Sequence, residues 1–382
     1  MQKKLIALAV AAAFSTSASA DVGFYGIVDG AIASISAKNQ KSAFIATSGA
    51  ASQSRLGVKA TEDLGNGLTA VAVVEYGIDT ENSDGSVAGA TPNQASAFTA
   101  RQKMLAVAGD FGTVATGYLQ TAAYDFLAKY DPLYGSSSSA HSIIAAGHLV
   151  GSGGQRAQRA VAYISPNISG LVLAANYVTA LSGNALGQSD VAPNNNFQHD
   201  SAVMVSANYV MDALSVGAVY ASADNGKNAA GTLAASGVAG SVAGLKTSEF
   251  ALGGSYDLGV AKVLGTFQSS KTDAANAKAN TLFSVSGLVP VPTGVIGVLF
   301  ASGKNAEAAA GSATALTAGY LHTFTKSTTG YVVFSNVKNG SASTGYSVAS
   351  NGLAPAWGAA SLTNVNNGAS STLFGVGLRK KF

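Results

Sequence analysis

The chain has 382 residues, of which 11% are charged and none is cysteine, and its formal net charge is +3. A soluble domain carries about 25% charged residues, so this composition argues against an ordinary soluble fold, and the small net charge gives no support to nucleic-acid binding. Without cysteine, neither disulfides nor thiolate metal sites can hold the chain together.

The first 20 residues predict export. Lys3 and Lys4 precede an apolar run from Leu5 to Phe14, and small residues follow up to Ala20. This is the pattern of a secretory signal peptide, so we expect residues 1–20 to be cleaved and residues 21–382 to form a single β-barrel domain. The apolar run is shorter than the roughly 20 residues of a membrane-spanning helix, and no later stretch approaches that length.

The rest of the chain reads as strands. Sixteen segments alternate apolar with small or polar residues, which is the period of a β-strand, and turn residues bound each of them. They are residues 22–34, 53–61, 68–78, 98–108, 113–120, 156–164, 170–179, 201–210, 213–222, 246–256, 260–270, 280–289, 294–302, 313–324, 329–338 and 371–382.

Short turns and long loops alternate strictly between these segments. The long loops are residues 35–52, 79–97, 121–155, 180–200, 223–245, 271–279, 303–312 and 339–370. An even-stranded up-and-down barrel places all short turns at one rim and all long loops at the other. We therefore predict an all-β, 16-stranded antiparallel transmembrane β-barrel with short periplasmic turns and long extracellular loops. A soluble sandwich or propeller is the alternative, although neither requires this alternation.

Each strand has one apolar and one polar face. Leu56 and Val58 share one parity, while Arg55 and Lys59 share the other. Tyrosines gather near both ends of the strands, as expected at two water interfaces; they are Tyr163, Tyr209, Tyr256 and Tyr331 near short turns and Tyr76, Tyr177 and Tyr220 near long loops. Sixteen strands enclose an aqueous lumen, so a passive diffusion channel is predicted.

Several motifs, in order along the chain, resemble those of the trimeric general porins of Gram-negative outer membranes, in particular the beta-proteobacterial branch. They are Ser54–Lys59, Glu62–Leu68, Tyr163–Asn167, Leu252–Gly259, and Val376–Arg379 before the terminal Phe382. The resemblance implies an outer-membrane homotrimer surrounded by lipid and lipopolysaccharide, with no cofactor. Phe382 would be the C-terminal signal for the barrel assembly machinery.

The resemblance also implies that the third long loop, residues 121–155, folds into each lumen as a constriction. Its first part, Tyr124–Pro132, resembles the constriction loop of the family. A mobile surface loop is the alternative for a connection of this length.

The residues expected at the constriction are charged. Selectivity depends on charges at the narrowest level, because screening at physiological salt acts over about 8 Å. The predicted basic residues are Arg55, Lys59, Arg101, Lys103 and Arg156, and the predicted acidic residues are Glu75, Asp125 and Asp131. An excess of cations favours a general diffusion porin for small hydrophilic solutes and ions with a weak anion preference. Alternatively, the arginines pair with these carboxylates and brace the loop.

Other functions have weaker support. An outer-membrane hydrolase needs a serine paired with a histidine on the barrel wall, and only His322 of the four histidines lies in a predicted strand, without a suitable neighbour. No His or carboxylate pair recurs at metal-ligand spacing. We therefore predict a protein that is not an enzyme and binds no metal. A substrate-specific channel for a small anion or sugar, and an adhesin without conductance, remain the alternatives.

Overall fold

The computed structural model describes residues 20–38, 40–81, 98–145, 147–153, 156–179, 201–224, 245–306, 311–341, 346–348 and 368–382. The predicted signal peptide therefore lies almost wholly outside the described residues. Seventeen strands form one antiparallel sheet. They are β1 (Asp21–Ala37), β2 (Ala43–Ser48), β3 (Arg55–Gly65), β4 (Leu68–Ile78), β5 (Phe98–Gly109), β6 (Gly112–Gln120), β7 (Arg156–Ile164), β8 (Leu171–Val178), β9 (Ser201–Met211), β10 (Leu214–Asp224), β11 (Lys246–Asp257), β12 (Lys262–Thr272), β13 (Asn280–Val291), β14 (Gly294–Asn305), β15 (Gly311–Thr325), β16 (Thr328–Asn339) and β17 (Ser370–Lys381).

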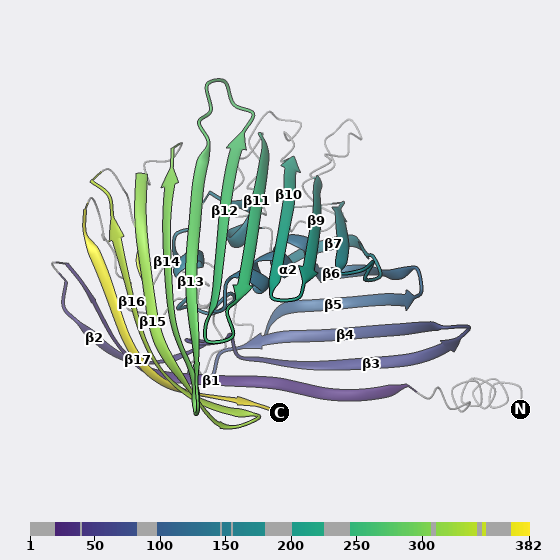
Figure 1. Cartoon of the computed structure of the whole chain (residues 1–382), viewed down its shortest axis with the longest axis horizontal. Helices are drawn as coiled ribbons and strands as arrows, with labels where there is room; N and C mark the ends of the chain where they lie inside the picture. Colours follow the sequence, from purple (N-terminus) through teal and green to yellow (C-terminus); the bar gives the residue numbers. More distant parts are fainter. Residues whose placement is uncertain are drawn as a thin grey trace, which may run out of the picture.

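The sheet closes on itself through its first and last strands. β1 pairs with β17 along one edge, with Gly30 opposite Leu378, and with β3 along the other, with Tyr25 opposite Gly57. The Gly26 and Phe382 backbones exchange hydrogen bonds of 3.0 and 3.2 Å. In Figure 1 the two ends of the colour scale accordingly lie side by side. Among the described residues, β1 and β3 to β17 each pair on both sides and so form a closed ring, as a spanning sheet requires.

Seventeen strands occupy sixteen places in this ring. β2 pairs with the second half of β1 and β3 with the first half, so the two short pieces together replace one long strand. The sequence analysis placed β2 inside the first long loop. Between β2 and β3 the backbone forms hydrogen bonds with the third long loop instead of with a neighbouring strand. The Ser137 amide donates to the carbonyl oxygen of Gly49 at 3.1 Å, and the Gln53 amide donates to that of Gly135 at 3.3 Å. The predicted 16-stranded antiparallel barrel is confirmed.

The two faces of the sheet have inverted polarity compared with a soluble protein. On β11, Phe250 and Leu252 are 45% and 52% exposed, whereas Glu249 and Ala251, which alternate with them, are buried. On most strands, the alternation of apolar and polar residues in the sequence predicts correctly which residues face outward and which face inward. Tyr331 is an exception, because its ring is buried on the inner face rather than exposed in an interfacial band. Among the described residues, no helix is both long and apolar enough to span a membrane.

The third long loop lies against the inner wall. It contains α2 (Ala122–Tyr130), α3 (Ala140–Ile143) and the short helical segment η1 (Leu149–Gly153). α2 contacts β8 to β12, and α3 contacts β13 to β15; Figure 1 shows α2 on the concave side of the sheet. Phe126 and Tyr130 are fully buried against Gly253, where a Cβ would overlap the Tyr130 ring. The glycine therefore makes room for the helix.

Two valine-to-arginine substitutions test the assignment of the faces. Val285 lies on the outer face and is 49% exposed, whereas Val71 lies on the inner face, in register with the buried Ala106. We expect Val285→Arg to lower the free energy of unfolding by about 2–4 kcal/mol, because it places a cation in lipid. Val71→Arg should lower it by under about 1 kcal/mol, because that side chain faces the lumen. Urea unfolding of both variants in lipid vesicles measures the difference. Equal costs would contradict the assignment.

Candidate functional site

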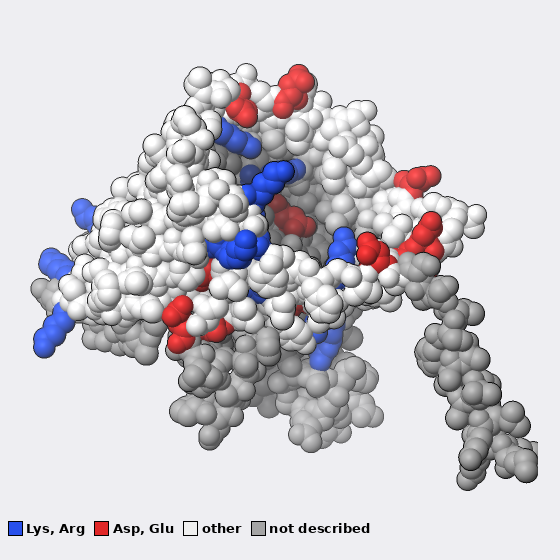
Figure 2. Space-filling model, turned by 90° about the horizontal axis from the view of Figure 1, so that it is seen from below, with Lys and Arg blue, Asp and Glu red and all other residues white. Residues whose placement is uncertain are grey.

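Charged side chains of both signs project into a central hollow of the molecule (Figure 2). The best-defined group surrounds Glu75 on the inner face of β4. The Arg101 Nε atom lies 2.6 Å from one carboxylate oxygen of Glu75, and the Arg55 Nε atom lies 3.8 Å from the other. Glu75 and Arg101 are only 4% and 3% exposed. Three neighbouring strands, β3, β4 and β5, thus bring one carboxylate and two guanidinium groups together.

Tyr25 completes this group and was not identified from the sequence. Its hydroxyl group forms a side-chain hydrogen bond with Glu75. The ring covers Gly57, where any Cβ would overlap it. Tyr25, Gly57 and Glu75 are successive cross-strand neighbours on the inner face. Their alignment depends on strand register, which a single sequence leaves open.

A β-bulge separates Arg101 from Lys103. Glu75 pairs with Gln102, but the next residue, Tyr76, pairs with Ala100, so Arg101 is the extra residue. On the two sides of the bulge, residues with the same odd or even numbering therefore face opposite sides of the sheet. Lys103 therefore pairs with the exposed Val74 on the outer face, and its Nζ atom lies 5.3 Å from the centre of the Tyr76 ring. The prediction that Lys103 faces the lumen was wrong for this reason.

The other two predicted basic residues lie on the lumen side. Lys59 is exposed on the inner face, opposite Val73 and nearer the short-turn rim. The Arg156 guanidinium group stacks on the Tyr124 ring of α2, 4.7 Å from its centre. Arg156 also interacts electrostatically with Arg101. Two guanidinium nitrogens of Arg156 and one of Arg101 are buried and have no hydrogen-bond partner among the described residues.

Asp125 and Asp131 have different environments. Asp125 is exposed on α2 and accepts a hydrogen bond of 3.3 Å from Gln120, which in turn accepts one of 2.9 Å from Gln102. Asp131 is 3% exposed at the end of α2 and accepts hydrogen bonds from the Ser139 hydroxyl and the Leu133 amide. Burial raises the pKa of Asp131 to about 6. Asp131 therefore braces the loop internally, and its predicted place among the lumen carboxylates was wrong.

Two further loop residues are anchored to the wall, and the sequence analysis did not assign them this role. The His148 Nδ1 atom lies 2.8 Å from Glu249, whose other carboxylate oxygen accepts hydrogen bonds from the backbone amides of Leu149 and Val150. The His141 Nε2 atom lies 3.1 Å from the side-chain oxygen of Gln268. Burial lowers the pKa of His141 to about 3. The loop is thus held by polar contacts to β11 and β12.

The terminal Phe382 lies at the seam of the barrel. Its ring occupies the space above Gly26, where a Cβ would overlap it, and it is 60% exposed. A larger residue at position 26 would displace the ring. Its function as an assembly signal stays a prediction.

The pH dependence of stability tests the burial of His141. Because the folded pKa of about 3 lies below the usual 6.5, His141 destabilises the folded state as pH falls below about 6.5. Asp131 has the opposite effect, because its folded pKa is raised and protonation favours the folded state below about pH 6. When the pH is lowered from about 7 to about 4.5, we expect the free energy of unfolding of His141→Gln to rise by about 3 kcal/mol relative to that of the wild type. Unfolding curves at both pH values measure this gain, and parallel pH profiles would contradict it.

Comparisons with known proteins agree with this geometry. The sequence profile of the Gram-negative porin family matches residues 7–342. Outer membrane porin protein 32 of Delftia acidovorans is 29% identical over 357 residues, covering 90% of this chain and 92% of the relative. The major outer membrane protein P.IB of Neisseria sicca is 31% identical over 186 residues, covering 46% of this chain and 47% of that protein.

Solved structures show the same fold. An anion-selective porin from Comamonas acidovorans has a TM-score of 0.68 and 24% identity, with 95% of this chain and all of that chain covered. OmpT of Vibrio cholerae has a TM-score of 0.61 and 17% identity, covering 96% of this chain and 99% of that one. Together with the closed barrel and its polar inner face, these matches show that the chain belongs to the Gram-negative porin family of the outer membrane.

Proposed function

We propose that the protein is a general diffusion porin with a weak preference for anions. The observation that carries this proposal is the excess of cations on the lumen side: Arg55, Arg101 and Arg156 surround one buried carboxylate, Glu75. Buried N–H groups without a partner favour an anion or its water shell, and a positive ring raises the local anion concentration. The name of the Comamonas acidovorans porin, an anion-selective one, agrees with this preference.

The preference is weak because the positive charge is partly compensated. Glu75 binds two arginines, so the bracing function considered from the sequence accounts for part of the group. Asp125 adds an exposed carboxylate close enough to Arg156 to interact with it. Within this group, only the guanidinium charge that is left uncompensated attracts anions.

We further propose that the barrel is a homotrimer formed after removal of a signal peptide. Phe24 and Phe44 on the outer surface of β1 and β2 are 74% and 78% exposed, which suits an apolar contact with a second copy of the chain. β1 begins at Asp21, the residue expected after cleavage. The expected partners are thus two further copies, outer-membrane lipid and lipopolysaccharide, and the barrel assembly machinery. N-terminal sequencing and native mass measurement test cleavage and trimerisation.

Two single-charge substitutions test the anion preference. Arg101 and Lys103 lie two residues apart on β5 but on opposite faces of the barrel. Arg101→Gln should shift the reversal potential in a salt gradient toward cation selectivity, because charges near the narrowest level dominate. Lys103→Gln is the matched control and should leave it unchanged. Cation preference in the wild type, or equal shifts in the two variants, would reject the proposal.

Liposome swelling distinguishes general diffusion from a substrate-specific channel. For neutral sugars of increasing size we expect a smooth fall in the rate of swelling, because a water-filled lumen without a binding site sorts such solutes by diameter. Saturable uptake of one sugar would favour the specific channel. Absence of both swelling and conductance would favour an adhesin.

A further inference from the structure

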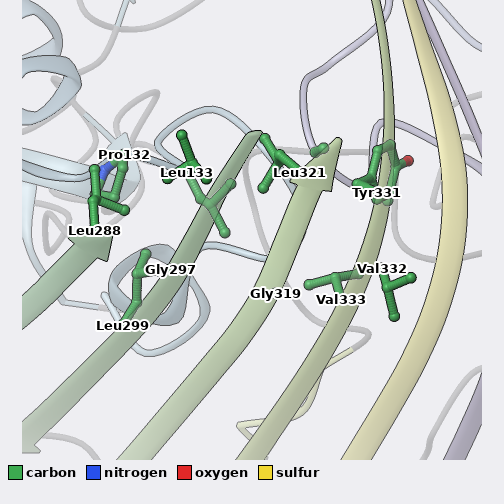
Figure 3. A pocket seen from close by; sticks show the side chains of 13 residues that line it. Pro132, Leu133, Leu288, Gly297, Leu299, Gly319, Leu321, Tyr331, Val332 and Val333 are labelled. Atoms are coloured by element: carbon green, nitrogen blue, oxygen red, sulfur yellow. The ribbon is translucent and has the colours of Figure 1, made fainter. Parts of the chain in front are cut away.

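An apolar cavity of about 210 Å³ lies on the lumen face of the barrel, between the third long loop and the wall of β13 to β16. Pro132 and Leu133 of the loop form one side, and Leu288, Leu299 and Leu321 of three successive strands form the other. Figure 3 shows Leu133 between Leu288 and Leu321. In contrast, the inner face near Glu75 is charged, so the cavity is an apolar site in a polar channel.

A pair of glycines creates the space. Gly297 of β14 and Gly319 of β15 are direct cross-strand neighbours, and both line the cavity. Because neither glycine has a side chain, an empty space remains at this point on the inner face, and the neighbouring leucines line it. A Cβ at Gly297 would lie 3.1 Å from the end of the Leu288 side chain, which is flexible. A larger side chain there would therefore fill the cavity.

The size of the cavity indicates the size of its occupant. A cavity of about 150 Å³ lined by apolar side chains binds benzene. A space of about 210 Å³ therefore accepts a single six-membered ring or a short branched chain. Because the lining is apolar, a strongly hydrated group would lose its hydration there without compensation.

Cations lie at two margins of the cavity. Lys262 is the cross-strand neighbour of Leu288 on the same face. Its other neighbour, Asp257, accepts a hydrogen bond of 2.8 Å from Gly259 within the turn. Opposite, Arg379 interacts electrostatically with Tyr331, which lines the cavity.

The Arg379 side is partly neutralised. Asp29 interacts with Arg379 and already accepts hydrogen bonds from the Tyr331 hydroxyl at 2.6 Å and the Ala51 amide at 3.4 Å. The Arg379 Nε atom is buried and has no hydrogen-bond partner among the described residues. A negatively charged group thus finds Lys262 at the β12 margin, or Arg379 beside an already engaged carboxylate at the β17 margin.

We propose that this cavity binds the apolar part of a small organic monocarboxylate during its passage, while the cation at one margin, Lys262 or Arg379, attracts the carboxylate. An aromatic or branched aliphatic acid has the required chemistry. The inference rests on the proposed function, because the cavity lies in the same lumen. It adds a retention site for one class of solute to a channel that otherwise sorts by size and charge.

Single-channel recording with benzoate, acetate and benzyl alcohol as probes tests the inference. Benzoate combines ring and charge, acetate lacks the ring, and benzyl alcohol lacks the charge. In the wild type we expect concentration-dependent current interruptions with benzoate, at least tenfold longer than with acetate. Lys262→Gln should shorten them several-fold without abolishing binding of the ring.

Two glycine-to-leucine variants provide the decisive comparison. Gly297→Leu fills the cavity and should remove the benzoate interruptions. Gly23→Leu is the matched control, because Gly23 faces the lumen beside Lys59 and a Cβ there meets nothing within 4 Å; it should leave them unchanged. Equal interruptions with benzoate and acetate, or their survival in Gly297→Leu, would overturn the inference.

A binding measurement separates the two proposals. Saturation-transfer NMR of benzoate with the detergent-solubilised protein needs no conductance, and the signal should disappear in Gly297→Leu but remain in Gly23→Leu. If Gly297→Leu does not fold, Leu321→Gln, which makes the cavity wall polar, replaces it. A wild-type protein without conductance rejects the proposed function, and a conducting protein without a benzoate signal rejects only the cavity.

Discussion

Closure of the backbone hydrogen-bond network is the constraint on which the rest of this structure depends. In hydrocarbon an unpaired N–H or C=O group costs several kcal/mol, so a spanning sheet must have no edge. The chain meets this requirement where its two ends join, through Gly26 and Phe382 and the ladder between β1 and β17. At the interruption between β2 and β3, backbone groups of Gly49 and Gln53 form hydrogen bonds with the backbone of the inner loop instead.

Closure also creates an interior in which polar groups are the rule. Buried serines, threonines, Glu249 and Gln268 form a wall that can hold loop residues by hydrogen bonds. Small residues decide where the loop approaches closely, because Gly253 makes room for Tyr130. The same principle operates at Gly57, which accommodates Tyr25 beside Glu75. Glycine on the inner face is therefore a means of shaping the lumen.

The charge arrangement and the apolar cavity occupy different parts of the lumen wall. The arginines around Glu75 come from β3, β5 and β7, and the cavity lies on β13 to β16. The loop contacts both regions, since Tyr124 stacks on Arg156 and Leu133 covers the cavity. One loop thus shapes both an ion-sensitive and an apolar part of the lumen.

The sequence by itself determined the barrel, its strand number and the face of most residues, because alternation and loop length are local and leave one compatible closed architecture. It could not place Lys103, Tyr331 or β2, since a one-residue bulge reverses parity and strand interruption depends on distant partners. Asp131 was misplaced for a similar reason: its burial depends on how the loop folds over Ser139. Only the tertiary structure decided which charges meet at Glu75 and where two glycines lie opposite each other, because both depend on the register and bulges between neighbouring strands.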